Sequence, residues 1–508
     1  MSINVICIYT VEDYDTIDQL LPSGTSIHFG LAIIATMLKV SGHNVRLLVF
    51  TPSTPLDDTL RPLIEDLKPQ LVCFTAVSTQ FLMVERISAH VKKLDPSIFI
   101  VVGGAHASLA PDETLASANI DGICISEGEI GILELARQIE EGHQPQEIPN
   151  FWLKINGKSS VKKNLTIPFQ DNLDRLPFID RELWRGWIKQ PIHQAAILIG
   201  RGCPNHCTYC SNHALRRLAP GRYVRFRSPA NIIDELVEIG KDPLINHIYF
   251  EIETITANME FCHELCQRLS VFNRDRQKPI KFSLNGSFTS NFARNSDTVN
   301  NFFLALKEAN IVTLKLGLES GSERIRNEVL KRPGYSNEEI ISFCKQANKY
   351  GIGIITYLLI GLPGETLGEF QKTIEVTRQC TPEMTDLSIF YPYPGTSLYI
   401  KAQQEKLFDP CTLEHKNERH FVALNLPGFS RSRILKEFVL INYRVFKKRW
   451  SFARRLNNVF YRTTLLYPYI TPFYASLRNS MKFLVKINRY SLEFVLKLRD
   501  FITTDRQP

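Results

Sequence analysis

Three cysteines carry the spacing in this chain that most clearly could do chemistry. Cys203, Cys207 and Cys210 form a C-x3-C-x2-C run. Thiolates so close together can hold one metal cluster, yet four-iron clusters are usually held by four cysteines and structural zinc by four Cys or His ligands. A set of three leaves one iron open to another molecule. An open position on a metal indicates chemistry rather than a purely structural site.

The run follows an apolar segment, residues 195–199, whose composition predicts a short β-strand. In barrels of alternating strands and helices, the loops at the carboxyl ends of the strands carry the active site. A zinc knuckle with His206 or His213 as fourth ligand is the competing structural interpretation, although no second CxxC or HxxxH pair accompanies the run. A disulfide is disfavoured because the loop has an odd number of cysteines.

The spacing resembles the radical S-adenosylmethionine (radical SAM) enzymes, whose hallmark is CxxxCxxC with an aromatic residue before the third cysteine, here Tyr209. The resemblance implies that Cys203, Cys207 and Cys210 hold a [4Fe-4S] cluster, and that the amino and carboxylate groups of SAM chelate its open iron. It also implies reductive cleavage of SAM to a 5′-deoxyadenosyl radical. Tyr209 is then expected beside bound SAM.

The composition is that of a globular protein with room for two or three domains: 508 residues, 44% hydrophobic and 22% charged. The first residues lack the basic region and cleavage site of a signal peptide. No run of 18 apolar residues predicts a membrane span. Eleven cysteines without a secretory signal indicate reduced thiols plus metal ligands, so we expect a cytoplasmic protein.

The net charge of +8 is unevenly distributed along the chain. Residues 431–508 contain 17 Lys or Arg and four Asp or Glu, whereas the preceding residues are slightly acidic. A basic end favours an anionic partner such as a membrane surface, a nucleic acid or an acidic substrate.

Residues 1–143 alternate short apolar runs with helical patterns, which predicts a doubly wound, Rossmann-like parallel sheet. The expected strands are 5–8, 45–49, 71–74, 98–102 and 120–125. Ligands of such sheets bind outside the carboxyl ends of the strands. The small or polar residues that follow these ends are Thr75, Ser78, Thr79, Gly103, Gly104, His106, Glu127 and Gly128. Taken singly, each is typical of an ordinary turn.

Together these segments resemble the cobalamin-binding domain found upstream of many radical SAM domains. The shared pattern is a Gly-Leu-Ala helix from Gly30 that ends at Gly42-His43, a Gly-Gly-x-His turn from Gly103, and a Gly-Glu-Gly-Glu turn that here begins with Ser126. The resemblance implies that the eight residues above bind cobalamin. The DxHxxG motif that supplies a histidine to cobalt in the related mutases is absent, so cobalamin would lack that ligand. A degenerate domain that no longer binds cobalamin is the alternative.

Residues 144–192 contain several prolines and predict an irregular connector, in which Leu173-Asp-Arg-Leu-Pro177 resembles the segment that commonly precedes a radical SAM domain. From 193 to 404 the strand–helix rhythm resumes. The expected strands are 194–200, 246–253, 280–286, 312–319, 354–360 and 385–391. Six such units match the partial (β/α)6 barrel of radical SAM enzymes, whereas a full barrel would need two more.

Two carboxylates, Glu253 and Glu319, end the second and fourth of these strands. Carboxylates make strong hydrogen bonds to a cationic amine and accept them from a ribose diol. The resemblance implies that Glu253, with Glu251 competing, lies near the SAM amino group, and that Glu319 and Ser320 contact its ribose or carboxylate region. It also implies that Gly361, in a Gly-x-Pro-Gly-Glu turn, lets the chain pass close to the adenine. The alternative for either acid is a solvated loop residue.

Residues 405–508 are basic and helical by periodicity. The apolar face expected of a final helix consists of Leu484, Ile487, Phe494, Val495, Leu498, Phe501 and Ile502. Such a face predicts a cap over the open barrel. A basic amphipathic helix also allows a peripheral membrane contact. Nucleic acid is disfavoured, since no recognisable binding module accompanies the basic residues.

These features predict a cobalamin-dependent radical SAM enzyme of a biosynthetic pathway. Its radical would abstract hydrogen from an unactivated carbon and cobalamin would supply a methyl group, while the same resemblance allows cyclisation or rearrangement. The expected partners are a small-molecule or lipid-like substrate and an electron donor such as flavodoxin or ferredoxin. A tRNA methylthiotransferase would need a second cluster, but Cys7, Cys73 and Cys124 fall inside predicted strands, where small buried residues belong. A non-catalytic cobalamin or redox sensor is the remaining alternative.

Overall fold

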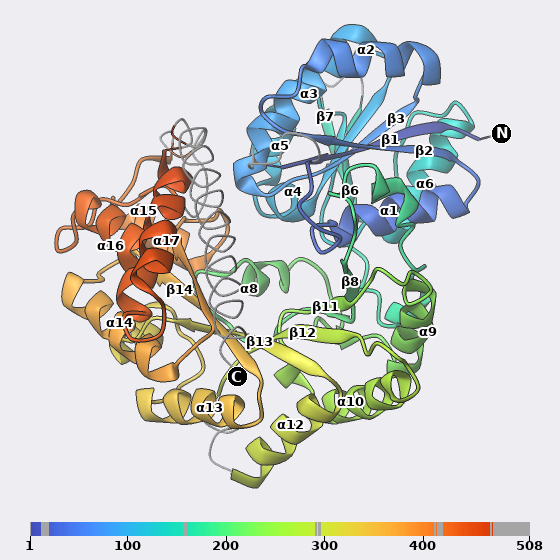
Figure 1. Cartoon of the computed structure of the whole chain (residues 1–508). Coiled ribbons are helices and arrows are strands. Elements are labelled where there is room, and N and C mark those ends of the chain that lie inside the picture. Colours follow the sequence, from blue (N-terminus) through green and yellow to red (C-terminus); the bar gives the residue numbers. More distant parts are fainter. Residues whose placement is uncertain are drawn as a thin grey trace, which may run out of the picture. The chain divides into compact units, whose positions relative to one another are not determined.

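The structure is a computed structural model that describes residues 2–11, 20–155, 160–289, 292, 296–410, 413, 420–467 and 470. The chain forms two compact units, Met1–Ile434 and Leu435–Pro508. The first unit contains two large sheets, and each is built mainly from parallel strands (Figure 1).

The first sheet has seven strands in the order β2-β1-β3-β4-β5-β6-β7. Its five parallel strands confirm the predicted ones: β1 (Asn4–Thr10), β2 (Asn44–Phe50), β3 (Leu71–Thr75), β4 (Phe99–Gly103) and β5 (Gly122–Cys124). The intervening helices are α1 (Phe29–Val40), α2 (Leu56–Leu67), η1 (Ser78–Gln80), α3 (Phe81–Leu94), α4 (Gly104–Leu109), α5 (Pro111–Ala116) and α6 (Glu129–Glu140).

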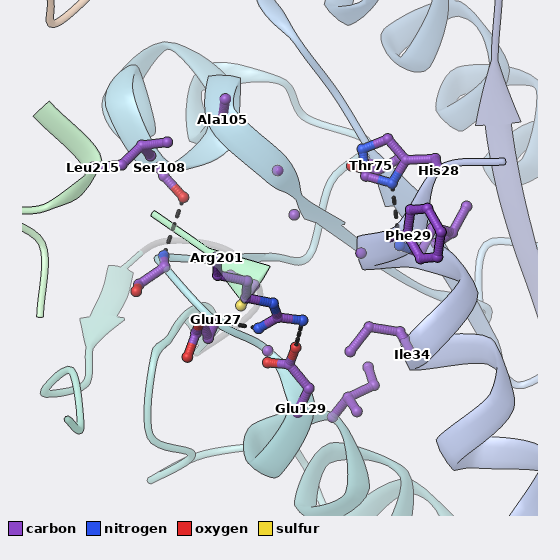
Figure 2. Close-up of a pocket in the computed structure, with 18 of the residues that line it drawn as sticks. His28, Phe29, Ile34, Thr75, Ala105, Ser108, Glu127, Glu129, Arg201 and Leu215 are labelled. Carbon is purple, nitrogen blue, oxygen red and sulfur yellow. Dashed lines mark hydrogen bonds and ion pairs between the residues drawn. The ribbon is translucent and has the colours of Figure 1, made fainter. Parts of the chain in front are cut away.

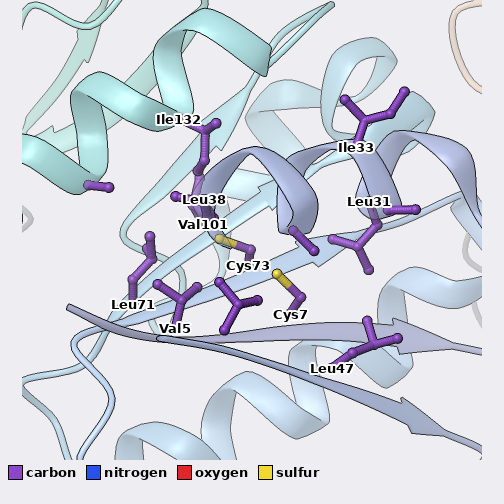
Figure 3. Close-up of a cluster of buried hydrophobic side chains, with 14 of the residues drawn as sticks. Val5, Cys7, Leu31, Ile33, Leu38, Leu47, Leu71, Cys73, Val101 and Ile132 are labelled. Carbon is purple, nitrogen blue, oxygen red and sulfur yellow. The ribbon is translucent and has the colours of Figure 1, made fainter. Parts of the chain in front are cut away.

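Successive side chains of β1 enter two different hydrophobic clusters, one on each face of the sheet. Val5 and Cys7 pack with side chains of α1 and α6 (Figure 3). Ile6 and Ile8 pack with side chains of α2 and α3. A strand covered on both faces needs apolar residues at every position, which explains the continuous apolar runs of this region.

The connector is less irregular than predicted, because it contains two further strands of the first sheet. β6 (Phe151–Ile155) pairs antiparallel with β5, and β7 (Ser160–Lys163) pairs antiparallel with β6. In β6 the buried Phe151 and Leu153 alternate with half-buried residues, as expected of a strand with one covered face. Two short helical turns follow, η2 (Leu173–Arg175) and α7 (Glu182–Arg185).

The second sheet confirms the six predicted strands, all parallel, in the order β15-β14-β13-β12-β11-β8. They are β8 (Gln194–Leu198), β11 (His247–Glu251), β12 (Lys281–Gly286), β13 (Ile311–Glu319), β14 (Gly353–Ile360) and β15 (Met384–Ile389). The principal helices between and after them are α9 (Pro229–Ile239), α10 (Met259–Arg274), α12 (Ser296–Glu308), α13 (Asn337–Lys349), α14 (Leu367–Cys380) and α15 (Ser397–Gln404). The order starts at β8 and ends at β15, as expected of a partial barrel.

Smaller elements follow the strands of the second sheet. β9 (Gly200–Arg201) and β10 (Arg225–Phe226) pair as a separate two-stranded antiparallel ribbon. The segment between these two strands contains the three cysteines and the short helix α8 (Asn212–Leu215). Two further turns are η3 (Ile255–Ala257) and η4 (Ile325–Val329), the second of which is a π-helix.

Two helices lie near the end of the described chain, α16 (Arg431–Val445) and α17 (Phe452–Leu466). The final helix predicted from Leu484 to Ile502 lies outside the described residues. Of the helices that the structure describes, none combines the length and the apolar character needed to cross a bilayer.

Candidate active site

The cysteine loop is anchored at its centre and at its end. The backbone N–H of Thr208 donates to the carbonyl of Leu330 at 3.0 Å, and its hydroxyl donates to the carbonyl of Val329 at 2.6 Å. At the end of the loop, His213 Nδ1 lies 2.6 Å from the carbonyl of Cys210. These bonds hold the three cysteines at the carboxyl end of β8, where the sequence predicted them.

His213 is not the fourth ligand that a zinc knuckle would require. A carbonyl only accepts, so Nδ1 carries the proton, and Nε2 accepts from the backbone N–H of Ser397 at 3.2 Å. Both ring nitrogens are therefore used to hold the loop, and burial lowers the pKa of this imidazole. His206, the other candidate, is exposed.

The three thiols of the loop fit an iron–sulfur cluster better than a single metal ion. Burial raises the pKa of Cys203 to about 11 and raises those of Cys207 and Cys210. Iron counteracts this effect, because a coordinated thiol loses its proton. In the part of the chain that the structure describes, no group of three His, Cys, Asp or Glu side chains is arranged for a single ion. A four-iron cluster binds each thiolate through a different iron, so three soft sulfur donors on one loop fit it.

The N-terminal cysteines are packed as apolar residues. Cys7 and Cys73 are direct partners in the register of β1 and β3, and both lie inside the first hydrophobic cluster (Figure 3). Cys124 belongs to the same cluster. Their burial agrees with the prediction that they are small core residues rather than ligands of a second cluster.

Glu253 lies two residues beyond β11 and lines a cavity that also contains residues of the first sheet. The residue is exposed and lines the cavity, while the surrounding protein still desolvates its carboxylate and raises its pKa. The backbone N–H of Gly202, next to Cys203, opposes that effect. The structure therefore brings this predicted SAM residue close to the cysteine loop.

Glu319 and Tyr209 are joined by Arg332, which sequence reasoning missed. Arg332 Nη1 lies 3.3 Å from Glu319 Oε1 and donates to the Tyr209 hydroxyl at 2.9 Å, and this hydroxyl also bonds to Glu319. Only 7% of Glu319 is exposed, so the alternative of a solvated loop acid is wrong for this residue. Burial raises its pKa, against the charge of Arg332.

The other two predicted SAM residues lie in turns. Ser320 is fully buried, and its hydroxyl accepts from the backbone N–H of Ser322 at 3.2 Å, so the structure does not bring this side chain to the cavity. Gly361 adopts a left-handed φ of 81°. Its N–H donates to Glu365 Oε2 at 2.7 Å, so the glutamate of the Gly-x-Pro-Gly-Glu motif stabilises its own turn. Burial raises the pKa of Glu365 to about 8.

A cavity of about 400 Å³ opens at the carboxyl ends of β3, β4 and β5 (Figure 2). Five of the eight residues predicted to bind cobalamin line it: Thr75, Gly103, Gly104, Glu127 and Gly128. The second sheet and its ribbon contribute Arg201, Gly202, Tyr223, Arg225 and Glu253. One cavity thus connects the edge predicted for cobalamin with the edge predicted for SAM.

The structure does not bring Ser78, Thr79 or His106 to this cavity. His106 is 3% exposed, its ring stacks on Phe81 at 4.2 Å, and its Nδ1 lies 3.3 Å from Ser78 Oγ. Burial lowers its pKa to about 4, so the ring is a neutral core residue. The residues of the Gly-Gly-x-His motif therefore have different roles: the two glycines line the cavity, and the histidine packs in the core.

The cavity walls fit a bulky cofactor with polar groups. Gly104 has a left-handed φ of 92°, and a side chain there would lie 2.7 Å from the carbonyl oxygen of Ala76. Glycine therefore lets the start of α4 approach the backbone at the end of β3 closely. Ile34, Cys73 and Ile132 supply apolar surface, and Glu129 supplies a buried oxygen with no partner. A volume of this size holds part of a molecule as large as cobalamin.

The turn after β5 is bound to the ribbon that carries the cysteine loop (Figure 2). Glu127 Oε1 accepts from Arg201 at 2.9 Å and from Arg225 at 2.7 Å, and Arg201 also donates to Glu129 Oε1 at 2.6 Å. Burial alone would raise the pKa of Glu127, but the hydrogen bond from Arg225 and the charge of Arg201 outweigh it and hold the pKa at about 2.

Arg201, Arg225 and Glu129 were not predicted as site residues. Arg201 and Arg225 face each other as direct partners on the ribbon, where two like charges would repel without a shared acid. The position of Arg201 in Gly-Arg-Gly-Cys203 could have indicated a buried ion pair, since a charge beside a buried metal-binding loop needs a partner. The identity of that partner, about seventy residues earlier, was not readable from spacing.

Two family profiles match the chain. Residues 197–377 match the Radical SAM superfamily, and residues 23–136 match the B12 binding domain. The first match covers most of the second sheet, and the second covers most of the first sheet.

Two sequence relatives extend over most of the chain. An uncharacterised methyltransferase of Pyrococcus horikoshii is 26% identical over 376 residues, which are 73% of this chain and 78% of that protein. An anaerobic magnesium-protoporphyrin IX monomethyl ester cyclase of Rubrivivax gelatinosus is 24% identical over 440 residues, which are 84% of this chain and 74% of that protein.

A solved structure shares the fold. The radical SAM methyltransferase TsrM from Kitasatospora setae, solved with cobalamin and a [4Fe-4S] cluster, superposes with a TM-score of 0.62 at 16% identity, over 80% of this chain and 75% of that one. The predicted fold class, a Rossmann-like sheet followed by a partial barrel and helices, is confirmed. The chain thus carries a B12-binding domain followed by a Radical SAM superfamily domain, and it has the fold of TsrM.

Proposed function

We propose that this protein is a cobalamin-dependent radical SAM enzyme that activates a C–H bond of a small molecule, most directly for methyl transfer in a biosynthetic pathway. The observation that carries the proposal is the shared cavity. Gly202, next to Cys203, and Glu253 line the same space as Gly103, Gly104 and Gly128. A radical formed at the cysteine loop and a methyl carrier held by the first sheet would therefore meet one substrate.

Each cofactor has a defined set of residues in this proposal. Cys203, Cys207 and Cys210 hold the [4Fe-4S] cluster, and Glu253, Glu319, Tyr209 and Gly361 are the residues assigned to SAM, whereas the buried Ser320 side chain is not. When bound, the cluster supplies the electron that cleaves SAM to methionine and a 5′-deoxyadenosyl radical, and cobalamin supplies a carrier for the methyl group. Glu253 accepts hydrogen bonds from the SAM amino group, while Thr208 and His213 keep the cysteine loop in place.

In this proposal cobalamin lies against five residues that line the cavity: Thr75, Gly103, Gly104, Glu127 and Gly128. The glycines leave room for the cofactor, and the turn that contains Glu127 closes one wall. An external electron donor such as flavodoxin or ferredoxin completes the reaction. A lipid-like substrate and a membrane contact rest on the final helix, outside the described residues, and stay predictions.

A cyclisation or rearrangement is the second candidate, because the Rubrivivax relative is a cyclase by name and its alignment covers 84% of this chain. The alignment with the methyltransferase from Pyrococcus covers 73% of this chain at slightly higher sequence identity, which supports the first candidate. The two differ in the fate of the methyl group of SAM. Carbon-13 in that methyl group reaches the product of a methyltransferase and stays out of the product of a cyclase.

The experiment that tests the radical chemistry needs no knowledge of the substrate. Protein reconstituted anaerobically with iron and sulfide is expected to hold about four irons per chain. With dithionite and SAM it is expected to release 5′-deoxyadenosine and methionine, measured by mass spectrometry. Cys207→Ser is expected to abolish the release, because it removes one of three thiolates.

The matched control is Cys344→Ala, which changes a buried cysteine of α13 outside the loop and is expected to retain the release. Wild-type protein that holds the cluster but releases no 5′-deoxyadenosine would contradict the proposal and favour a sensor. A content of about eight irons per chain would instead favour a two-cluster methylthiotransferase.

A further inference from the structure

The two glutamates of the turn after β5 differ in what their oxygens contact. Glu127 has no acceptor position left. Its Oε1 accepts from Arg201 and Arg225, and its Oε2 accepts from Arg225 at 3.0 Å and from the backbone N–H of Gln170 at 2.9 Å. A carboxylate offers about four lone-pair positions, so these four donors saturate it.

Glu129 has one oxygen that nothing satisfies. Its Oε1 accepts from Arg201 Nη2 at 2.6 Å, whereas its Oε2 is buried and has no hydrogen-bond partner. The residue is 6% exposed and lines the cavity (Figure 2). Burying an acceptor without a donor is costly, and such atoms are rare in folded proteins, so this oxygen calls for a donor from the occupant of the cavity.

The residues around Glu129 indicate which kind of group the missing donor is. Arg201 already supplies the nearby positive charge, so the missing partner is an N–H or O–H group rather than a second cation. The adjacent wall is apolar, with Ile34, Cys73 and Ile132 lining the same cavity. A large cofactor with apolar surface and amide groups at its edge, as cobalamin is, matches both features.

We infer that Glu129, rather than Glu127, is the carboxylate of this turn that binds cobalamin, with its Oε2 accepting a hydrogen bond from a cobalamin amide N–H. Glu127 is a positioning residue that holds the turn against Arg201 and Arg225. The inference rests on the proposed function, since it requires cobalamin in the cavity. It assigns a binding role to the last residue of the Ser-Glu-Gly-Glu turn, which was not among the eight residues predicted to bind cobalamin.

The test is a titration of the full-length protein with hydroxocobalamin, followed by absorbance and equilibrium dialysis. Glu129→Gln keeps an acceptor for Arg201 and places an NH2 group where the cofactor offers an N–H, so the Kd is expected to rise about tenfold. Glu127→Gln is expected to lower the melting temperature and to change the Kd of the folded protein less than Glu129→Gln does. Glu134→Gln, on α6 but outside the cavity lining, is the control with unchanged Kd.

Glu129→Asp serves as a second variant, because it keeps the charge beside Arg201 but draws the free oxygen back by one methylene. It is expected to weaken binding in the same direction. Equal Kd values for wild type, Glu129→Gln and Glu129→Asp would overturn this inference alone and assign the free oxygen to solvent. Wild-type protein that takes up no hydroxocobalamin would overturn the cobalamin part of the proposed function as well.

Discussion

At the scale of single residues, the site depends on charges whose partners lie far along the chain. Glu319 ends β13, and its partner Arg332 lies beyond the π-helix η4, where it also donates to Tyr209 in the cysteine loop. A buried ion pair is strongly destabilised when one member is removed, because the remaining charge stays buried without compensation. Here the remaining charge would be that of Arg332, whose side chain is 6% exposed.

Glu319→Gln is therefore expected to lower the free energy of unfolding by about 3 kcal/mol, measured by urea denaturation of the cofactor-free protein. Glu328→Gln is the matched control, because its carboxylate is exposed and lies 3.9 Å from Arg324, so no measurable change is expected. Equal midpoints for the two variants would show that the buried pair contributes nothing to stability.

At the scale of elements, one wall of the cavity includes a close approach of two strand ends that requires glycine. Gly104 starts α4 directly after β4 with a left-handed φ, and an added Cβ would lie 2.7 Å from both the Ala76 carbonyl oxygen and Thr75 Oγ1. The backbone of one strand end thus fills the space that a side chain on the next would need. Gly142 offers the contrast, because it has a φ of 72° with nothing within 4 Å of an added Cβ.

Gly104→Ala and Gly142→Ala separate steric contact from conformational strain. Both place an alanine in the left-handed region, which costs about 1 kcal/mol. Gly104→Ala must also displace backbone, so its total cost is expected to be about 3 kcal/mol in urea denaturation. It is also expected to weaken hydroxocobalamin binding, while Gly142→Ala leaves binding unchanged. Similar costs for both variants would contradict the steric argument.

At the scale of the first unit, the two sheets are joined by a buried charge cluster of Glu127, Glu129, Arg201 and Arg225. The cluster connects the cavity turn of the first sheet to Arg201, two residues before Cys203. The carboxylate of Glu127 must be ionised to hold both arginines. The connection between the predicted cobalamin and cluster sites is therefore sensitive to acid.

The pKa of Glu127 is lowered from 4.5 to about 2 in the folded protein, so its contribution to stability is complete above pH 4.5 and is lost as the pH falls toward 2. Between about pH 5 and about pH 3 the expected loss is about 2 kcal/mol. Chemical denaturation at the two pH values measures it, and Glu127→Gln is expected to show a smaller difference between them than wild type.

Glu134 is the control for this pH dependence. Its pKa is also lowered to about 2, but by hydrogen bonds from Arg137 and Gln138 at a half-buried position on α6. Solvent and salt screen such a pair, so Glu134→Gln is expected to change the pH dependence of stability much less than Glu127→Gln does. A change as large as that of Glu127→Gln would contradict the assignment to the buried cluster.

Local patterns were sufficient for the elements and for the cysteine site. Apolar runs predicted the five parallel strands of the first sheet and the six of the second, because a strand buried on both faces needs apolar residues in succession. The spacing of Cys203, Cys207 and Cys210 indicated a shared cluster, because ligands within one loop are close in any fold. The antiparallel β6 and β7 were missed, since prolines in the same region suggested irregular structure.

Only the tertiary structure decided which polar residues face the cavity. The Gly-Gly-x-His and Ser-Glu-Gly-Glu motifs marked the right turns, but His106 points into the core, Glu127 is saturated by two arginines, and Glu129 keeps a free oxygen. The physical reason is that a motif constrains the backbone of a turn, whereas the direction and partners of each side chain depend on elements many residues away. The sequence alone thus determined the fold class and predicted the cluster ligands, and long-range contacts determined which partners the residues around them have.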